Sequence, residues 1–124
     1  MQPDPKTLRA IKRECRRMAH EMMLEQYSRY DAIWWDRIRI DQALLDHGRE
    51  VVAEINQLMP NLLSRDQNVG SVDEVAERYN FETTSDLVDY LKAYTPRGPV
   101  EEGYFEMLLN ERLHEYETVD EVPF

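Results

Sequence analysis

The spacing of apolar residues constrains the fold of this chain more than any other feature of its sequence. Near the N-terminus the spacing alternates between three and four residues, at Leu8, Ile11, Cys15, Met18 and Met22. Such residues lie along one narrow seam of an α-helix. Asp4 and Pro5 have the residue types that favour an N-cap and a first helical position. The pattern predicts a helix over about 5–28.

A second stretch with helical periodicity follows. Its apolar residues share one seam: Trp34, Ile38, Leu45, Val52, Ile55 and Met59. Asp31 can cap a new helix, or the first helix can continue through residues 27–35 with a bend. Gly48 is a second weak point, and Pro60 ends the run because the residue before proline avoids the α region. Residues 5–59 are therefore expected to form a long helical hairpin or one arm.

Shorter helices are expected in the rest of the chain. Ser71 and Glu74 have the spacing of a capping box, and Asn80 suits a left-handed residue that closes the helix after Tyr79. Further helices are predicted at 85–94, capped by Thr83 or Thr84, and at about 100–117. No alternating stretch is long enough for a sheet. We expect an all-α fold with one domain over 1–117, an acidic subregion at 71–117, and a flexible acidic tail at 118–124.

Composition points to a globular protein of the cytoplasm. Hydrophobic residues make up 42% of the chain and charged residues 32%, which is enough for a modest core. The one cysteine, Cys15, has no partner for an internal disulfide. No signal peptide and no membrane-length apolar run is visible. We expect a cytoplasmic protein with no membrane association.

Charge is distributed unevenly along the sequence. Residues 1–65 carry eleven Lys and Arg against ten Asp and Glu, whereas residues 66–124 carry four against fifteen. The net charge of −10 therefore arises almost entirely in the second part of the chain. Such an imbalance predicts a surface that attracts basic partners.

The first helix carries a basic stripe opposite its apolar seam. Basic side chains in the first turns of a helix oppose the helix dipole, so this stripe has either a binding role or an internal partner. The candidate anion-binding residues are Lys6, Arg9, Arg13, Arg16 and Arg17. The stripe either binds nucleic acid or an acidic protein, or pairs with the acidic second part of the chain, or is simply solvated.

Two further groups are candidates for contact with a partner. Trp34 and Trp35 point about 100° apart on a helix, so one can pack inside while the other reaches outward. Trp35 with Arg37 and Arg39 has the composition of an interface hot spot, although packing in the core explains the aromatic residues equally well. The acidic candidates for docking are Glu101, Glu102, Glu106, Glu115, Glu117, Asp120 and Glu121.

Catalytic signatures are missing from the sequence. It has no Gly-rich phosphate loop, no nucleophile elbow and no paired cysteines for zinc. Glu111 and His114 have the spacing of a di-iron ligand pair, but that site needs the pattern twice and two further glutamates. We therefore expect no enzyme activity, no cofactor and no metal site.

One segment resembles a known motif. Ala76, Asn80, Phe81, Leu87 and Leu91 lie within residues 72–96, which resemble the helix-turn-helix of AraC-type regulators. In that resemblance Ala76 is the small contact residue and Asn80 replaces the turn glycine. The segment is also similar to helical parts of phage-encoded polyvalent proteins. The resemblance implies DNA binding, but six acids against two bases at 71–95 argue against it.

Three hypotheses for function follow. The first is a non-enzymatic interaction protein whose acidic surface docks on a basic protein, such as a phage or mobile-element accessory protein or a nucleic-acid mimic. The second is a helix-turn-helix DNA-binding regulator that uses the basic stripe. The third is an assembly factor that forms a homodimer through the seam of the first helix.

Overall fold

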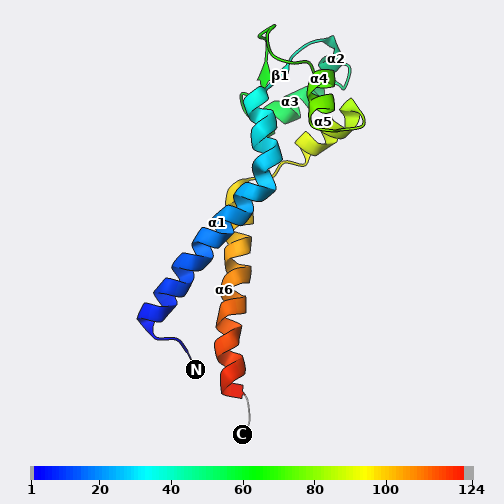
Figure 1. Ribbon diagram of the computed structural model, residues 1–124. Helices are drawn as coiled ribbons and strands as arrows, with labels where there is room; N and C mark the ends of the chain where they lie inside the picture. Colours follow the sequence, from blue (N-terminus) through cyan, green and yellow to red (C-terminus); the bar gives the residue numbers. More distant parts are fainter. Residues whose placement is uncertain (1, 122–124) are drawn as a thin grey trace. The chain divides into compact units, whose positions relative to one another are not determined.

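The structure is a computed structural model that describes the backbone of residues 2–121 and the side chains of residues 2–116. The chain forms two compact units. Unit 1 consists of residues 1–27 and 96–124, and unit 2 of residues 28–95. Figure 1 shows the elements of both units, and the first helix contributes residues to each of them. Within residues 2–121 no helix is long and apolar enough to cross a membrane.

The first helix, α1, spans Pro5–Asp36. Its predicted start is confirmed, because the Thr7 N–H donates a hydrogen bond to the Asp4 carboxylate at 2.7 Å. It continues past the predicted end at residue 28, since no Gly or Pro interrupts the sequence before Asp36. Arg37 ends it in the left-handed region, with φ of 65°. The possibility that the first helix continues through residues 27–35 is the one that the structure bears out.

Unit 1 is a pair of helices. Its second helix, α6, spans Arg97–Glu121 and packs against α1 through Phe105. Phe105 belongs to a small core with Ile11, Cys15 and Ala19. The buried residues of α1 in this unit recur every four positions, at Ile11, Cys15, Ala19, Met23 and Tyr27. The predicted seam shares only the first two of these positions.

The limits of α6 differ from the predicted 100–117. The helix begins at Arg97 because Pro99 lies in its first turn, where a missing N–H costs no hydrogen bond. It extends to Glu121, so residues 118–121 of the predicted flexible tail are helical. Residues 122–124 lie outside the described part of the chain.

Unit 2 breaks the second predicted helix into several pieces. After α1 ends, the strand β1 spans Ile38–Arg39, α2 spans Gln42–Leu45 and α3 spans Arg49–Leu58. The separation has local causes. The Asp41 side chain accepts a hydrogen bond from the Leu44 N–H and so starts α2, and Gly48, with φ of 108°, separates α2 from α3. The helical stretch after α1 is therefore shorter and more divided than its apolar spacing predicts, and one of its breaks lies at the predicted weak point, Gly48. The all-α class and the long N-terminal helix are confirmed.

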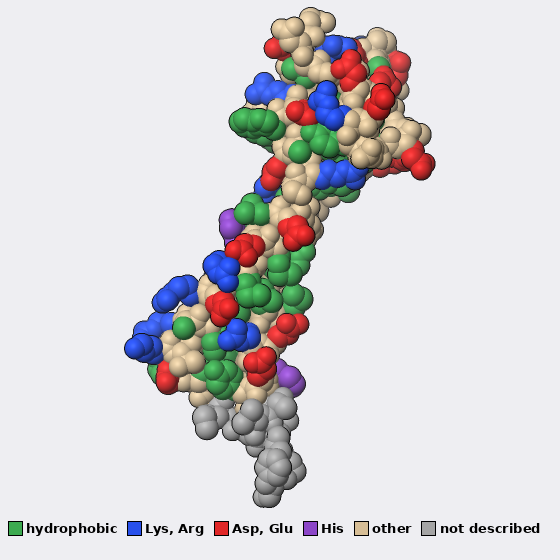
Figure 2. Space-filling model, viewed as in Figure 1, with side chains coloured by type: hydrophobic (Ala, Val, Ile, Leu, Met, Phe, Trp, Pro, Cys, Tyr) green, Lys and Arg blue, Asp and Glu red, His purple; other side chains and the backbone are tan. Residues whose placement is uncertain are grey.

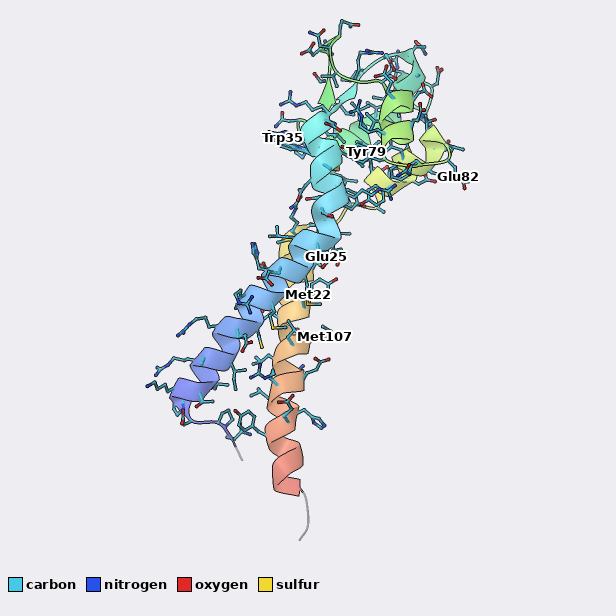
Figure 3. The ribbon with its side chains drawn as sticks, viewed as in Figure 1. Met22, Glu25, Trp35, Tyr79, Glu82 and Met107 are labelled. Atoms are coloured by element: carbon cyan, nitrogen blue, oxygen red, sulfur yellow. The ribbon has the colours of Figure 1, made fainter. Side chains whose placement is uncertain are left out.

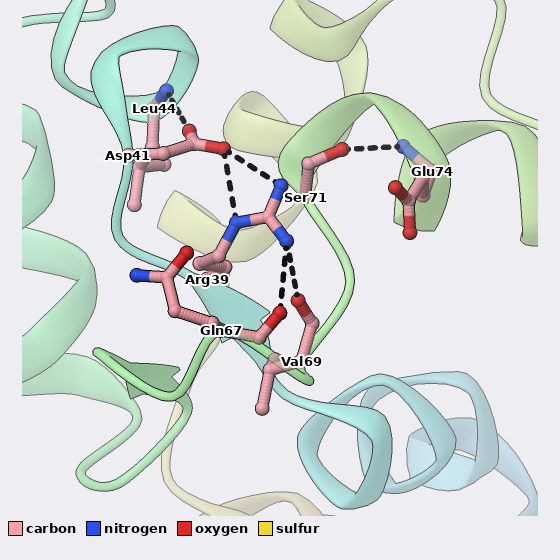
Figure 4. Close-up of polar contacts among 7 residues, drawn as sticks. All are labelled: Arg39, Asp41, Leu44, Gln67, Val69, Ser71 and Glu74. Atoms are coloured by element: carbon pink, nitrogen blue, oxygen red, sulfur yellow. Dashed lines mark hydrogen bonds and ion pairs between the residues drawn. The ribbon is translucent and has the colours of Figure 1, made fainter.

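Two short strands form a parallel pair in unit 2. β1 pairs with β2, which spans Leu63–Ser64, with Ile38 opposite Leu63. The side chain of Arg39 connects this pair to the following loop, as Figure 4 shows. Its guanidinium donates to the carbonyls of Gln67 and Val69 and pairs with Asp41 at 3.4 Å. Strands of two residues are too short to produce an alternating pattern, so the sequence did not predict them.

The remaining helices of unit 2 follow the predicted signals closely. α4 spans Val72–Arg78 and α5 spans Thr84–Lys92. The Ser71 hydroxyl accepts from the Glu74 N–H, and the Thr83 hydroxyl caps α5. Asn80 has φ of 64° between the two helices, as predicted. Both helices close over the core of unit 2, whose fully enclosed side chains include Ile33, Ile38, Leu44, Ile55, Leu62, Val75, Leu87 and Leu91.

Candidate partner-binding surfaces

The basic stripe of α1 lies partly against acidic residues of α6. The Arg16 guanidinium makes two hydrogen bonds to the Glu102 carboxylate, at 2.5 and 3.3 Å, and stacks on the Phe105 ring at 3.6 Å. These hydrogen bonds hold the pKa of Glu102 below its usual value and raise the pKa of Arg16. His20 Nδ1 is also within hydrogen-bond distance of the Glu101 carboxylate. The two oppositely charged parts of the sequence therefore meet within unit 1.

Other cations of the stripe stay available. Arg17 pairs with Glu21 on its own helix at 2.9 Å, an exposed pair of the kind that contributes little stability. Lys6, Arg9, Lys12 and Arg13 are exposed, and no residue in the described part of the chain forms an ion pair with them. Figure 2 shows Lys and Arg side chains along the N-terminal part of α1. The stripe is thus reduced to its N-terminal end, and Lys12 joins the predicted residues there.

The acidic candidates on α6 divide into three groups. Glu101 and Glu102 are occupied by His20 and Arg16. Glu106 and Glu115 are exposed and form no ion pair with a residue whose side chain is described. The remaining three lie where side chains are outside the described residues: Glu117, Asp120 and Glu121. The predicted acidic surface on α6 is therefore smaller than its sequence indicates.

The Trp35 patch is only partly assembled. The side chain of Trp35 points outward from the surface of unit 2 in Figure 3 and is 80% exposed. Trp34, by contrast, packs on the core of unit 2, and its indole N–H donates a hydrogen bond to the Pro60 carbonyl at 3.0 Å. The alternative that one tryptophan packs inside and the other points outward thus holds. Arg37 is exposed beside Trp35 in the chain. Arg39 is held by the contacts described above, so it does not extend the patch.

A larger acidic surface lies on α4 and α5. Its carboxylates are exposed, and none forms an ion pair with the described part of the chain: Asp73, Glu74, Glu77, Glu82, Asp86 and Asp89. Three of them, Asp73, Glu77 and Glu82, line a pocket of about 300 Å³ together with Phe81. Figure 3 shows Glu82 at the outer edge of unit 2. The excess of acids at 71–95 was the sequence signal for this surface, but it served only as an argument against DNA binding.

A polar network holds α4 in place beneath this surface. The Tyr79 hydroxyl donates to Asp36, which also pairs with Arg78 at 3.1 Å. Burial, together with the Asp36 carboxylate, raises the pKa of Tyr79 to about 12. The hydrogen bond from Tyr79 lowers the pKa of Asp36, and Arg78 adds to that effect. Arg29 donates to the Tyr79 carbonyl and stacks on the ring of Phe81 at 4.0 Å.

The described residues offer little for metal or thiol chemistry. Among side chains of residues 2–116, no three His, Cys, Asp or Glu converge on one point. Cys15 is buried between the helices of unit 1, and this burial raises the pKa of its thiol. A thiol whose pKa is raised is a poor nucleophile at neutral pH.

The chain was compared with protein families, curated proteins and solved structures. Searches with the chain found no matching family model, no similar curated protein and no similar solved structure.

Proposed function

We propose that this chain is a non-enzymatic interaction protein that binds a basic protein surface through the acidic face of α4 and α5. The observation that carries the proposal is the exposure of six carboxylates that form no ion pair with any residue whose side chain the structure describes. By contrast, Glu101 and Glu102 of α6 are already paired. Unpaired charges of one sign steer association with an oppositely charged partner.

The pocket lined by Phe81 adds an apolar element to this face. Phe81 is partly buried, stacked by Arg29 and tilted against Tyr90 at 5.4 Å between ring centroids. Carboxylates that share a pocket with an aromatic residue suit a Lys or Arg side chain, whose apolar stem packs in the pocket while its cation meets the acids. A nucleic-acid mimic, as small mobile-element proteins employ, is one form that such an acidic protein takes.

The test compares capture of partners by three forms of the tagged chain. The first is unchanged, the second carries Asp73→Asn, Glu77→Gln and Glu82→Gln, and the third carries Glu106→Gln, Glu111→Gln and Glu115→Gln on α6. Each triple variant removes three negative charges, so net charge is matched. We expect the first and third forms to capture the same basic proteins, released by about 0.5 M salt, and the second to lose them. Equal capture by all three forms, or loss only in the α6 variant, contradicts the proposal.

The exposed cations at the N-terminal end of α1 favour DNA binding as a second candidate function. Its test is fluorescence anisotropy of a labelled random duplex at low and physiological salt, with Arg9→Glu, Arg13→Glu as the variant. This pair is preferable to any change of Arg16, which also breaks the contact with Glu102. Binding that falls steeply with salt and is lost in the variant favours the regulator. No binding at either salt leaves the acidic face as the functional surface.

The homodimer hypothesis meets a structural obstacle. Ile11 and Cys15, the centre of the predicted dimer seam, are buried against α6 within one chain. Dimerisation through that seam therefore requires α6 to leave it. Analytical ultracentrifugation of the whole chain decides this point, and we expect a monomer.

A further inference from the structure

Unit 2 contains a second, larger groove on which none of the surfaces above depends. It has a volume of about 650 Å³ and lies between one face of α3 and the strand β2. Val52, Ala53 and Asn56 form the helix side, and Leu63 and Arg65 form the strand side. Ile40 and Leu45 complete an apolar lining. A volume of this size accommodates several side chains rather than one.

The charged side chains that line this groove have the opposite sign to the net charge of the chain, which is −10. Arg49 and Arg65 both line it, both are exposed, and no residue in the described ranges forms an ion pair with either. No Asp or Glu lines the groove. Arg49 is also the first residue of α3, where a cation opposes the helix dipole. In a chain of net charge −10, two such arginines beside an apolar groove point to an anionic occupant.

The backbone beside the groove favours an extended occupant. Ile38 and Ile40 donate to the carbonyls of Leu62 and Ser64, at 3.0 and 2.7 Å, so these two residues face β1. Alternate residues of a strand direct their polar groups to opposite sides, so the N–H and C=O of Leu63 face outward. In the described residues β2 pairs with β1 alone, so no second strand covers this edge. An outward edge of this kind is where an added peptide strand forms its main-chain bonds.

We propose that this groove binds an extended peptide segment of a partner protein in which acidic and large apolar residues alternate. Its backbone pairs with Leu63, an apolar side chain enters between Val52 and Leu63, and neighbouring carboxylates bind Arg49 and Arg65. The site recognises a negatively charged segment, whereas the face of α4 and α5 recognises a positive one. The two proposals are therefore independent.

The test is an NMR titration of the ¹⁵N-labelled full chain with peptides Gly-Glu-X-Asp-X-Glu-Gly, where X is Leu, Val or Phe. We expect amide shifts at Leu63, Arg49 and Val52 with at least one peptide. The same peptides with Lys in place of the acids should leave these amides unmoved. Two variants test the role of the groove. The double variant Arg49→Glu, Arg65→Glu should weaken peptide binding at least tenfold. Ala53 lines the groove and is exposed, so Ala53→Trp should fill the groove and prevent peptide binding. Arg9→Glu, Arg13→Glu is the matched control, because it makes the same change in net charge at two exposed cations of unit 1.

Three results would overturn the proposal. One is no shift at the groove with any acidic peptide while the spectra show a folded chain. Another is equal binding of the Lys peptides, which would mean that Arg49 and Arg65 do not select charge. The third is binding of decanoate without binding of any peptide, which would make the groove a site for a small amphiphile.

Discussion

Asn80 occupies the turn between α4 and α5, where its backbone conformation affects the stability of the fold. It has φ of 64°, a region in which residues other than Gly, Asn and Asp are strained by about 1–2 kcal/mol. We expect Asn80→Ala to lower the free energy of unfolding by about 1 kcal/mol, and Asn80→Gly to change it little. Urea unfolding followed by tryptophan fluorescence measures both, since Trp34 and Trp35 lie in unit 2. Equal stability of the two variants would show that the conformation imposes no strain.

Tyr79 makes a prediction for alkaline pH. Its pKa is raised to about 12, so the folded state keeps the phenol proton that the unfolded state loses near pH 10. The stability that Tyr79 contributes is thus complete below pH 10 and is lost as the pH rises toward 12. Tyr79→Phe should remove this part of the alkaline loss of stability, whereas Tyr104→Phe should not. Denaturant unfolding at pH 8, 10 and 11 tests this; identical pH profiles of all three forms would contradict it.

The hydrogen bonds of Tyr79 are an example of contacts that the sequence did not predict. Asp36, Arg78 and Tyr79 carry no sequence signal that brings them together, because α1 and α4 meet only through the tertiary fold. Asn80 and Ser71 were predictable because their roles depend on a few neighbouring residues. Helix caps and turn conformations could be predicted from neighbouring residues, whereas side-chain contacts between elements far apart in the sequence could not.

At the scale of helices and strands, local features were again predicted better than contacts between distant parts of the chain. The caps of α4 and α5 were predicted to within a residue or two. The stretch 31–59 was expected to be helical because its apolar spacing is helical throughout, with a weak point at Gly48. Gly48 does interrupt it, with a positive φ, whereas periodicity does not detect the cap at Asp41 that starts α2. The long N-terminal helix was expected to pack with the shorter C-terminal helices, but the seam alone does not show which of them covers it.

The packing of α1 on α6 makes a prediction about size. Ala19 is fully buried in the small core with Phe105, so a larger side chain must displace α6. We expect Ala19→Leu to lower the free energy of unfolding by about 1–3 kcal/mol, the usual result of overpacking. Ala10→Leu, at an exposed position of the same helix, is the control and should have little effect. Circular dichroism during thermal unfolding reports the helices of unit 1; no difference between the variants would mean that α6 does not lie against Ala19.

Arg39 is expected to act as a structural connection rather than a binding residue. Its guanidinium holds the carbonyls of Gln67 and Val69 and the Asp41 carboxylate (Figure 4). Arg39→Met keeps much of the volume but leaves these groups without a donor. We expect a loss of about 1.5–3 kcal/mol in the free energy of unfolding. Arg37→Met, at an exposed site, should not reproduce this loss. A stable Arg39→Met chain that loses partner capture would instead return Arg39 to the binding patch.

At the scale of the whole molecule, α1 contributes residues to both units. A single domain, as the sequence predicts, requires that both units unfold together. Both tryptophans lie in unit 2, so fluorescence follows that unit, while circular dichroism follows the helices of both. We expect the two urea transitions to coincide, because each unit depends on an intact α1. Two separate midpoints would show that the units are independent domains.

The charge of the whole molecule was visible in the sequence, but its placement was not. The acidic excess after residue 65 does not form one surface. Part of it lies on α6, where Glu101 contacts His20 and Glu102 pairs with Arg16. Among the side chains of residues 2–116, most of the exposed carboxylates after residue 65 that form no ion pair lie in the segment of α4 and α5. Counting charges therefore predicted a basic partner, but attributed the contact to residues 101–121, two of which are already engaged.

Carbodiimide cross-linking tests the central claim most directly, because the reagent joins carboxylates to lysines only where they touch. The tagged chain is cross-linked in lysate, and mass spectrometry identifies which of its carboxylates are joined to lysines of other proteins. The account predicts cross-links at Asp73, Glu77 and Glu82, suppressed by high salt. Cross-links confined to Glu106 and Glu115, or none to any other protein, would contradict it.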